Sequence, residues 1–170
     1  MPLVKNGVLA ADDYLTILDG GAIPESAPVL INAARFLEGA AELTRRNAPI
    51  GVIWPNDRRV SELEPYLERL ALIALVFPSF RDGRAYSQAR QLREHYGYKG
   101  EMRATGEVLR DQLHFMVRAG FDSFAVKKEA DANAFVESVN RYSVFYQPSG
   151  DNRTIAAQLR RSNGKSPSGT

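Results

Sequence analysis

Two hydrophobic periods alternate along the middle of the chain. Short apolar runs at residues 50–54, 72–77, 101–105 and 122–126 are typical of strands. Between them, apolar residues recur every three or four positions, which predicts helices. The helical stripes are Ala33/Leu37/Ala40, Val60/Leu63/Leu67/Leu70, Ala85/Ala89/Leu92/Tyr96, Leu109/Leu113/Met116 and, after an Asp131 cap, Phe135/Val139/Tyr142.

This alternation predicts an α/β fold of repeated βα units with mainly parallel strands, because each interval leaves room for one crossover helix. About five such units are too few for a closed eight-stranded barrel of about 250 residues. Two architectures remain open. One is a partial TIM-barrel-like sheet, closed by its own N-terminal strands or by a second copy. The other is an open flavodoxin-like sheet with helices on both faces.

The pattern divides the chain into three parts. Residues 1–27 show no sustained period, and Asn6-Gly7 predicts a hairpin turn within them. Residues 28–147 form the single α/β domain. Residues 148–170 are polar and end in a Gly-, Pro- and Ser-rich run, so we expect this tail to be disordered.

Composition excludes several classes of protein. The net charge of +2 does not indicate nucleic-acid binding, and no apolar run approaches the length of a membrane span. The first residues lack the pattern of a signal peptide, so we expect a cytoplasmic protein. The absence of cysteine excludes disulfides, thiol nucleophiles and cysteine-ligated clusters. With only His95 and His114 available, the usual kind of zinc site is not expected.

Candidate chemistry gathers where predicted strands end. In parallel α/β folds, ligands bind at the carboxyl ends of the strands, so the segments 79–84 and 105–112 should line one mouth. Arginine side chains and backbone N–H groups there predict an oxyanion site. Simple structural pairing, such as Arg84 with Asp82, is the alternative interpretation. The candidate anion-binding residues are Ser79, Arg81, Asp82, Gly83, Arg84, Tyr86, Ser87, Thr105, Gly106 and Gln112.

Three further residues are candidates for catalytic roles. Arg103 stands inside a predicted strand, where a charge is costly unless it is paired or points into a site. Glu107 and Asp111 follow that strand, and Glu107 is either an acid/base group or a partner of the helix dipole. Neither a GxGxxG nor a GxxxxGK[ST] motif is present, so no nucleotide fingerprint supports a cofactor.

The run from Phe77 to Phe124 resembles a bacterial family of unknown function whose members are described as oxidoreductases of sulfite reduction. The genes of that family often lie beside those for sulfite reductase and phosphoadenylylsulfate reductase. The motifs that carry the resemblance are FPSFRDGRAYS, LREHYGYKGEMRA, GEVLRDQ and GFD. The matching residues are Asp82, Gly83, Arg84, Tyr86, Ser87, Arg93, Gly100, Glu101, Arg103, Gly106, Asp111 and Gln112. A looser likeness of residues 103–126 to enolase-type barrels favours the partial barrel.

The resemblance implies a role in assimilatory sulfate or sulfite reduction, with no settled mechanism and no identified cofactor. Two hypotheses follow. The protein is an oxidoreductase or redox accessory that handles a sulfur oxyanion, with Arg81, Arg84 and Arg103 as charge clamps. Alternatively, it is a non-catalytic partner that docks on sulfite reductase or its electron donor. The sequence does not indicate an oligomeric state.

Overall fold

The computed structural model describes residues 1–17, 19–127, 132–134 and 136–137. Eight strands in these residues form one sheet in the order β2-β1-β8-β7-β6-β5-β4-β3. The strands are β1 (Leu3–Lys5), β2 (Val8–Ala10), β3 (Leu15–Thr16), β4 (Val29–Asn32), β5 (Ile50–Trp54), β6 (Leu70–Phe77), β7 (Glu101–Gly106) and β8 (Ser123–Ala125). Strands β3 to β8 pair in parallel, whereas β1 is antiparallel to both β2 and β8.

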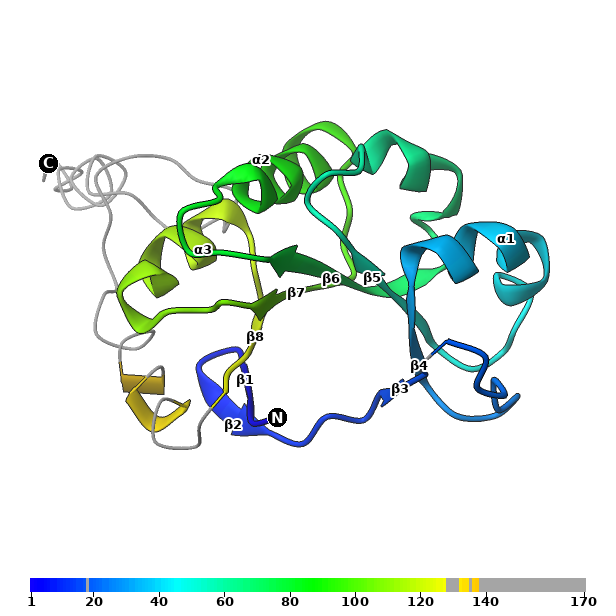
Figure 1. Ribbon diagram of the computed structural model, residues 1–170, viewed down its shortest axis with the longest axis horizontal. Helices are drawn as coiled ribbons and strands as arrows, with labels where there is room; N and C mark the ends of the chain where they lie inside the picture. The colour runs from blue at the N-terminus through cyan, green and yellow to red at the C-terminus, as the bar shows by residue number, and fades with distance from the viewer. Residues whose placement is uncertain (18, 128–131, 135, 138–170) are drawn as a thin grey trace, which may run out of the picture.

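The sheet curls into a half-barrel with its helices on the convex side (Figure 1). The helices are α1 (Ala33–Leu43), the 3-10 helix η1 (Val60–Tyr66), α2 (Arg84–Arg90), the π-helical η2 (Gln91–His95), the 3-10 helix η3 (Arg110–Gln112) and α3 (Leu113–Ala119). The expected α/β class with mostly parallel strands is therefore confirmed. The curl of the sheet departs from the open flavodoxin-like alternative, and the likeness to a TIM barrel stays a prediction.

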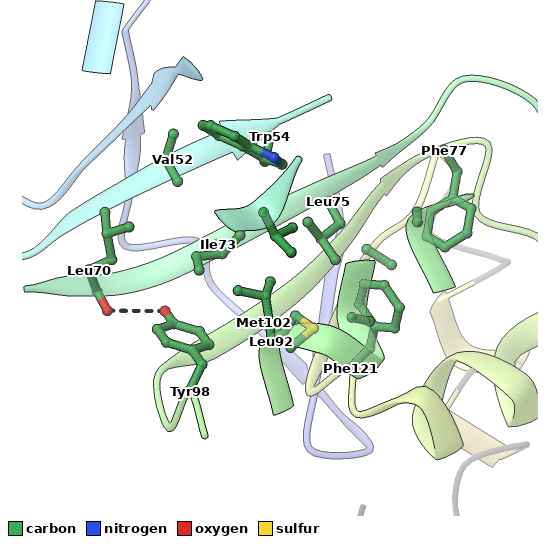
Figure 2. Packing of buried hydrophobic residues seen from close by; sticks show 14 of the residues in the cluster. Val52, Trp54, Leu70, Ile73, Leu75, Phe77, Leu92, Tyr98, Met102 and Phe121 are labelled. Atoms are coloured by element: carbon green, nitrogen blue, oxygen red, sulfur yellow. Dashed lines mark hydrogen bonds between the residues drawn. The ribbon is translucent and has the colours of Figure 1, made fainter. Parts of the chain in front are cut away.

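Alternating side chains of the parallel strands build the core beneath the helices. Val52, Trp54, Ile73, Leu75 and Met102 point to the convex side and are buried against the helical layer. Figure 2 shows this packing, together with the Tyr98 hydroxyl, which donates a hydrogen bond of 3.0 Å to the Leu70 carbonyl. Residues on both faces of β5 and β6 are buried, so these strands stand in the sequence as continuous apolar runs.

The opposite, concave face carries a much smaller apolar cluster. Leu30, Leu72 and Ala74 are buried there, with Tyr14 and Ile53 packed against them. The chain between β2 and β3 crosses this side of the sheet (Figure 1). This extended segment therefore covers part of the concave face. In a closed barrel, side chains from all the strands would fill the space on that side.

The N-terminal residues belong to the sheet. Asn6 and Gly7 have φ values of 52° and 77°, as a two-residue hairpin turn requires, so the expected hairpin is confirmed. Strand β1 then joins β8 through the register pair Val4 and Phe124. The half-barrel is thus extended at one edge by the N-terminal hairpin and at the other by β3.

Two expected helices differ from the observed ones. The stripe from Val60 to Leu70 predicts one α-helix, but the chain forms a 3-10 helix that contains Pro65, and Leu70 already begins β6. Proline lacks the N–H that a continuous α-helix needs. Of the helix expected after Asp131, residues 132–134 and 136–137 are helical, and the rest lies outside the described residues, as does the tail 148–170.

Candidate functional site

The loops that follow β6 and β7 lie side by side, as expected for neighbouring parallel strands. The Phe80 N–H donates to Oε2 of Glu107 at 3.0 Å. The Gln112 amide donates from Nε2 to the Phe80 carbonyl at 2.8 Å. Glu107 and Gln112 thus hold the loop at residues 79–82 against the loop after β7. Their described contacts are with the loop backbone.

Gly106 allows this close approach of the two loops. Its φ is +91°, and a Cβ at this position would lie 2.3 Å from the Phe77 carbonyl oxygen. The Glu107 N–H donates to that same oxygen at 2.7 Å. Only glycine fits here without moving the backbone.

At residues 79–84, where the sequence predicts an oxyanion site, Asp82 is paired with Arg84. The Asp82 carboxylate accepts hydrogen bonds from the Arg84 backbone N–H at 3.2 Å and from Arg84 Nη2 at 2.6 Å. Hydrogen bonding to the Arg84 guanidinium holds the pKa of Asp82 well below its usual value. The alternative pairing interpretation of Arg84 is therefore the one observed at this loop.

Other candidate residues of these loops have packing roles. The Arg81 guanidinium stacks over the ring of Phe80, 5.3 Å from its centroid. The Tyr86 ring meets the ring of Phe77 edge-to-face at 5.1 Å, and burial raises the pKa of Tyr86 to about 12. A phenol held in this way stays neutral at ordinary pH, so Tyr86 contributes to the core.

The remaining candidates divide between strand and surface. Thr105 is paired with Val76 inside the sheet. Gly83 precedes α2 with a φ of −82°, an ordinary conformation. Ser79 is half-buried, and its Oγ accepts a 3.4 Å hydrogen bond from the Arg81 N–H. Asp111 lies exposed in η3.

Arg103 does not join the other candidate arginines. Its side chain is 3% exposed on the concave face. Nη1 lies 2.9 Å from Oδ2 of Asp12, Nη2 lies 3.0 Å from Oε1 of Glu101, and the guanidinium stacks over Tyr14 at 5.7 Å. The expected clamp of Arg81, Arg84 and Arg103 is therefore corrected. Arg103 is the centre of an ion-pair network, which satisfies its buried charge.

Glu101 connects that network to β8 and β1, which follow β7 on one side of the sheet. It accepts hydrogen bonds from Lys5 Nζ at 2.5 Å and from Ser123 Oγ at 2.6 Å, in addition to Arg103. Burial alone would raise the pKa of Glu101, but the hydrogen bonds from Lys5 and Ser123 and the charge of Arg103 outweigh it. The net pKa of Glu101 lies below its ordinary value, so this carboxylate is ionised near neutrality.

The loops after β6 and β7 form a rim at the carboxyl ends of these strands. A groove of about 690 Å³ lies beside this rim, between the loop after β5 and the α2–η2 segment. Three of its lining residues are arginines, namely Arg58, Arg59 and Arg84, and Asp57 is its one acidic lining residue. Arg58 is paired with Glu62 at 3.2 Å. Among the described residues, the side chain of Arg59 has no hydrogen-bond or ion-pair partner. Arg59 is thus the arginine of this groove that is left without a partner in the described part of the chain, at the carboxyl end of β5.

Two buried amides form part of the wall of the groove. Asn56 is 8% exposed and Gln88 is 6% exposed. Gln88 donates from Nε2 to the carbonyls of Pro55 at 2.9 Å and Arg58 at 2.8 Å, and this fixes its orientation. Oε1 of Gln88 is buried and has no hydrogen-bond partner in the described part of the chain. A buried acceptor without a donor costs free energy unless a ligand or water supplies one.

Sequence reasoning found only part of this groove. Arg84 and Ser87 were candidates, whereas Arg59, Gln88 and His95 were not. The signal that could have found Arg59 is the segment 55–59, which follows the β5 strand directly and carries two adjacent arginines. Gln88 gives no such signal, because its role depends on contacts with residues about thirty positions away.

A second, larger hollow of about 970 Å³ lies near the start of β5, lined by Arg46, Glu42 and Pro49 among others. Arg46 Nη2 there donates to the carbonyls of Pro24 at 2.7 Å and Ala27 at 2.9 Å. Arg46 thus anchors the chain that precedes β4. Within the described ranges, no group of three or more His, Cys, Asp or Glu residues is arranged to hold a metal ion.

Comparison with known proteins places the chain in one family. No curated protein matches it. None of the helices in the described residues has the length and apolar character needed to cross a membrane. The model of a family described as "Bacterial protein of unknown function (DUF934)" matches residues 51–156, which is more than half of the chain. That match spans β5 to β8, the two loops of the rim and the arginine-lined groove, and the protein therefore belongs to this bacterial family.

Proposed function

We propose that this protein binds an anionic ligand in the groove beside β5 and serves assimilatory sulfite reduction. The observation that carries the proposal is that Arg58, Arg59 and Arg84 line one groove. Planar guanidinium groups suit oxyanions because they donate paired hydrogen bonds. The carboxyl ends of parallel strands are also where α/β folds usually place their ligands.

Arg59 is the principal anion-binding residue of this proposal. The Arg84 guanidinium already donates from Nε and Nη2 to Asp82, so it contributes charge and its remaining N–H groups. Asp57 lies close enough to Arg84 to raise the pKa of its guanidinium, after the larger effect of the hydrogen bond to Asp82. Arg59 has neither restraint within the described structure, so an incoming anion pairs with it at the lowest cost.

The pathway rests on the sequence motifs that resemble the sulfite-reduction family. The chain has no cysteine, so thiols cannot carry the electrons of such a reaction. Either a bound cofactor supplies that chemistry, or the protein is an accessory that delivers or senses an anion for a separate reductase. We favour the accessory role, because every described contact of Glu107 and Arg103 is structural.

Calorimetric titration with sulfite, sulfate and phosphate tests the binding. We expect Arg59→Ala to weaken anion binding by about ten- to hundredfold, since a charge-assisted hydrogen bond contributes roughly 1.5–3 kcal/mol. Arg84→Ala should weaken it less. Arg90→Ala is the matched control, because Arg90 is exposed on the same helix and does not line the groove. Equal affinities of the Arg59 and Arg90 variants would contradict the proposal.

A second candidate function is docking on sulfite reductase or its electron donor. Phe80 and Leu109 are 45% and 43% exposed on the two adjoining rim loops, and Arg81 stacks on Phe80. Exposed aromatic and arginine side chains are frequent centres of protein interfaces. Purified sulfite reductase should bind the native protein and lose affinity for a Phe80→Ser, Leu109→Ser double variant. The same affinity for both would remove this candidate.

A further inference from the structure

The groove is too large for an inorganic oxyanion alone. A volume of about 690 Å³ falls within the range of roughly 300–1,000 Å³ that is usual for organic ligands. A water molecule occupies about 30 Å³ in the liquid, and a four-oxygen anion needs only a few times that volume. Most of the groove would stay empty if sulfite or phosphate were its only ligand. Its other lining groups therefore indicate the chemistry of the rest of the ligand.

The groove runs along one face of the α2–η2 segment. Arg84, Gln88, Gln91 and His95 line it and recur at spacings of three or four residues. A helical segment from residue 84 to residue 95 is roughly 16 Å long at 1.5 Å per residue. Arg84 stands at one end of this face and His95 at the other, with the buried amide of Gln88 between them. The arginine, the amide and the histidine thus follow one another along the groove.

The amide of Gln88 fixes the wall at the middle of the groove. Both of its N–H groups are used by the carbonyls of Pro55 and Arg58. Because Oε1 is itself buried, a ligand in the groove lies against the surface of this wall. Ser87 lies next to Gln88 on the same wall.

The far end of the groove is aromatic. The rings of His95 and Tyr96 meet edge-to-face, with 4.7 Å between centroids and an interplanar angle of 83°. His95 is exposed and Tyr96 is half-buried, so the pair forms a surface on which a flat ring can pack. Stacking of a base on an aromatic side chain contributes about 1–3 kcal/mol in single-strand binding proteins.

From this order of groups we infer that the ligand is a nucleotide. Its phosphate lies between Arg59 and Arg84, its sugar lies against Ser87 and Gln88, and its base packs beside Tyr96 and His95. Neither a P-loop nor a glycine-rich dinucleotide fingerprint is needed, because side chains supply the contacts that those motifs obtain from backbone N–H groups. This inference rests on the proposed anion-binding function and names the class of anion.

Titration of the full-length protein with AMP, ADP, adenosine and inorganic phosphate tests the inference. We expect AMP to bind at least tenfold more tightly than either adenosine or phosphate, because it occupies both ends of the groove. Affinities for AMP and phosphate within twofold of each other would overturn the nucleotide while leaving the anion site intact. No binding of AMP, phosphate or sulfite would overturn both.

Three variants test where the phosphate and the base of the ligand lie. Arg59→Ala should lower the affinity for AMP and for phosphate alike. Tyr96→Ala should lower the affinity for AMP and leave phosphate binding unchanged, whereas Tyr96→Phe, which keeps the ring, should bind AMP as the native protein does. If Tyr96→Ala binds AMP with native affinity while its folding is intact by circular dichroism, the base does not lie where we place it and the inference is wrong.

Discussion

Nη2 of Arg93 lies 2.5 Å from Oδ2 of Asp122, and this contact ties the end of the α2–η2 segment to the turn before β8. The same guanidinium donates to the carbonyls of Tyr98 at 2.7 Å, Gly100 at 3.0 Å and Gly120 at 3.0 Å. Asp122 in turn accepts from the Met102 N–H at 2.8 Å. One side chain therefore fixes two loops, the one before β7 and the one before β8.

Replacing Arg93 should destabilise the protein strongly. The Arg93 side chain is 13% exposed, and its removal takes this donor from three carbonyls and the ion pair from Asp122. We expect Arg93→Ala to lower the free energy of unfolding by about 3 kcal/mol. Urea denaturation measures the change. Arg90→Ala, on the exposed side of α2, should alter it by less than about 0.5 kcal/mol. Similar values for the two variants would show that the cluster contributes little.

Acid should weaken the fold partly through Glu101. Its pKa in the folded protein lies below the ordinary value of 4.5, so its contribution to stability is complete above that pH. The contribution is lost as the pH falls through the lower folded pKa, because the carboxyl then binds a proton and releases Lys5 and Arg103. Thermal unfolding between pH 7 and pH 3 should show a smaller decrease in Tm for Glu101→Gln than for the native protein. Parallel curves would contradict this role.

Two glycines with positive φ should differ in their tolerance of alanine. At Gly106, a Cβ would lie 2.3 Å from the Phe77 carbonyl oxygen, whereas at Gly97, with φ of +64°, it would meet nothing within 4 Å. Gly97→Ala should therefore cost only the conformational penalty of about 1 kcal/mol. Gly106→Ala should cost about 3 kcal/mol or more, because the backbone must also move. Urea denaturation distinguishes the two, and equal costs would mean that the rim loops adjust freely.

The proposed pathway has a genetic readout. A strain that lacks this protein should grow poorly with sulfate or sulfite as its sole sulfur source and should recover on sulfide or cysteine. An Arg59→Ala gene should fail to restore growth although the variant folds, since the groove would have lost its principal cation. An Arg90→Ala gene should restore it. Normal growth of the deletion strain on sulfite, with no substitute protein present, would remove the pathway assignment.

The strands of this fold were predictable where a local pattern encodes them. The expected strand at Ile50–Trp54 is observed with the same bounds, and those at 72–77, 101–105 and 122–126 differ by one or two residues at their ends. A strand buried on both faces is a continuous apolar run, which the sequence shows directly. The curl of the sheet was left open between two architectures, because it depends on how the strand edges are completed.

The surroundings of the charged residues were not predictable in this way. Arg103 is hydrogen-bonded to Asp12, which lies 91 positions away in the sequence. Gln88 is hydrogen-bonded to Pro55, which lies 33 positions away. Such pairs leave no periodic signal, so Arg103 carried the same sequence evidence for a site as for a structural pair. Arg84 and Asp82 were easier, because a turn of three residues brings them together.

The position of β1 in the sheet also bears on how the chain folds. Strand β1 pairs with β2 at once, but its other neighbour, β8, leaves the ribosome only about 120 residues later. Strands β4 to β7 pair with partners close in sequence and can assemble first. Closing so long a loop is entropically costly and makes this step slow. Docking of the N-terminal hairpin is thus the step that completes the molecule, and until then the open edge of β8 is exposed to other chains during synthesis.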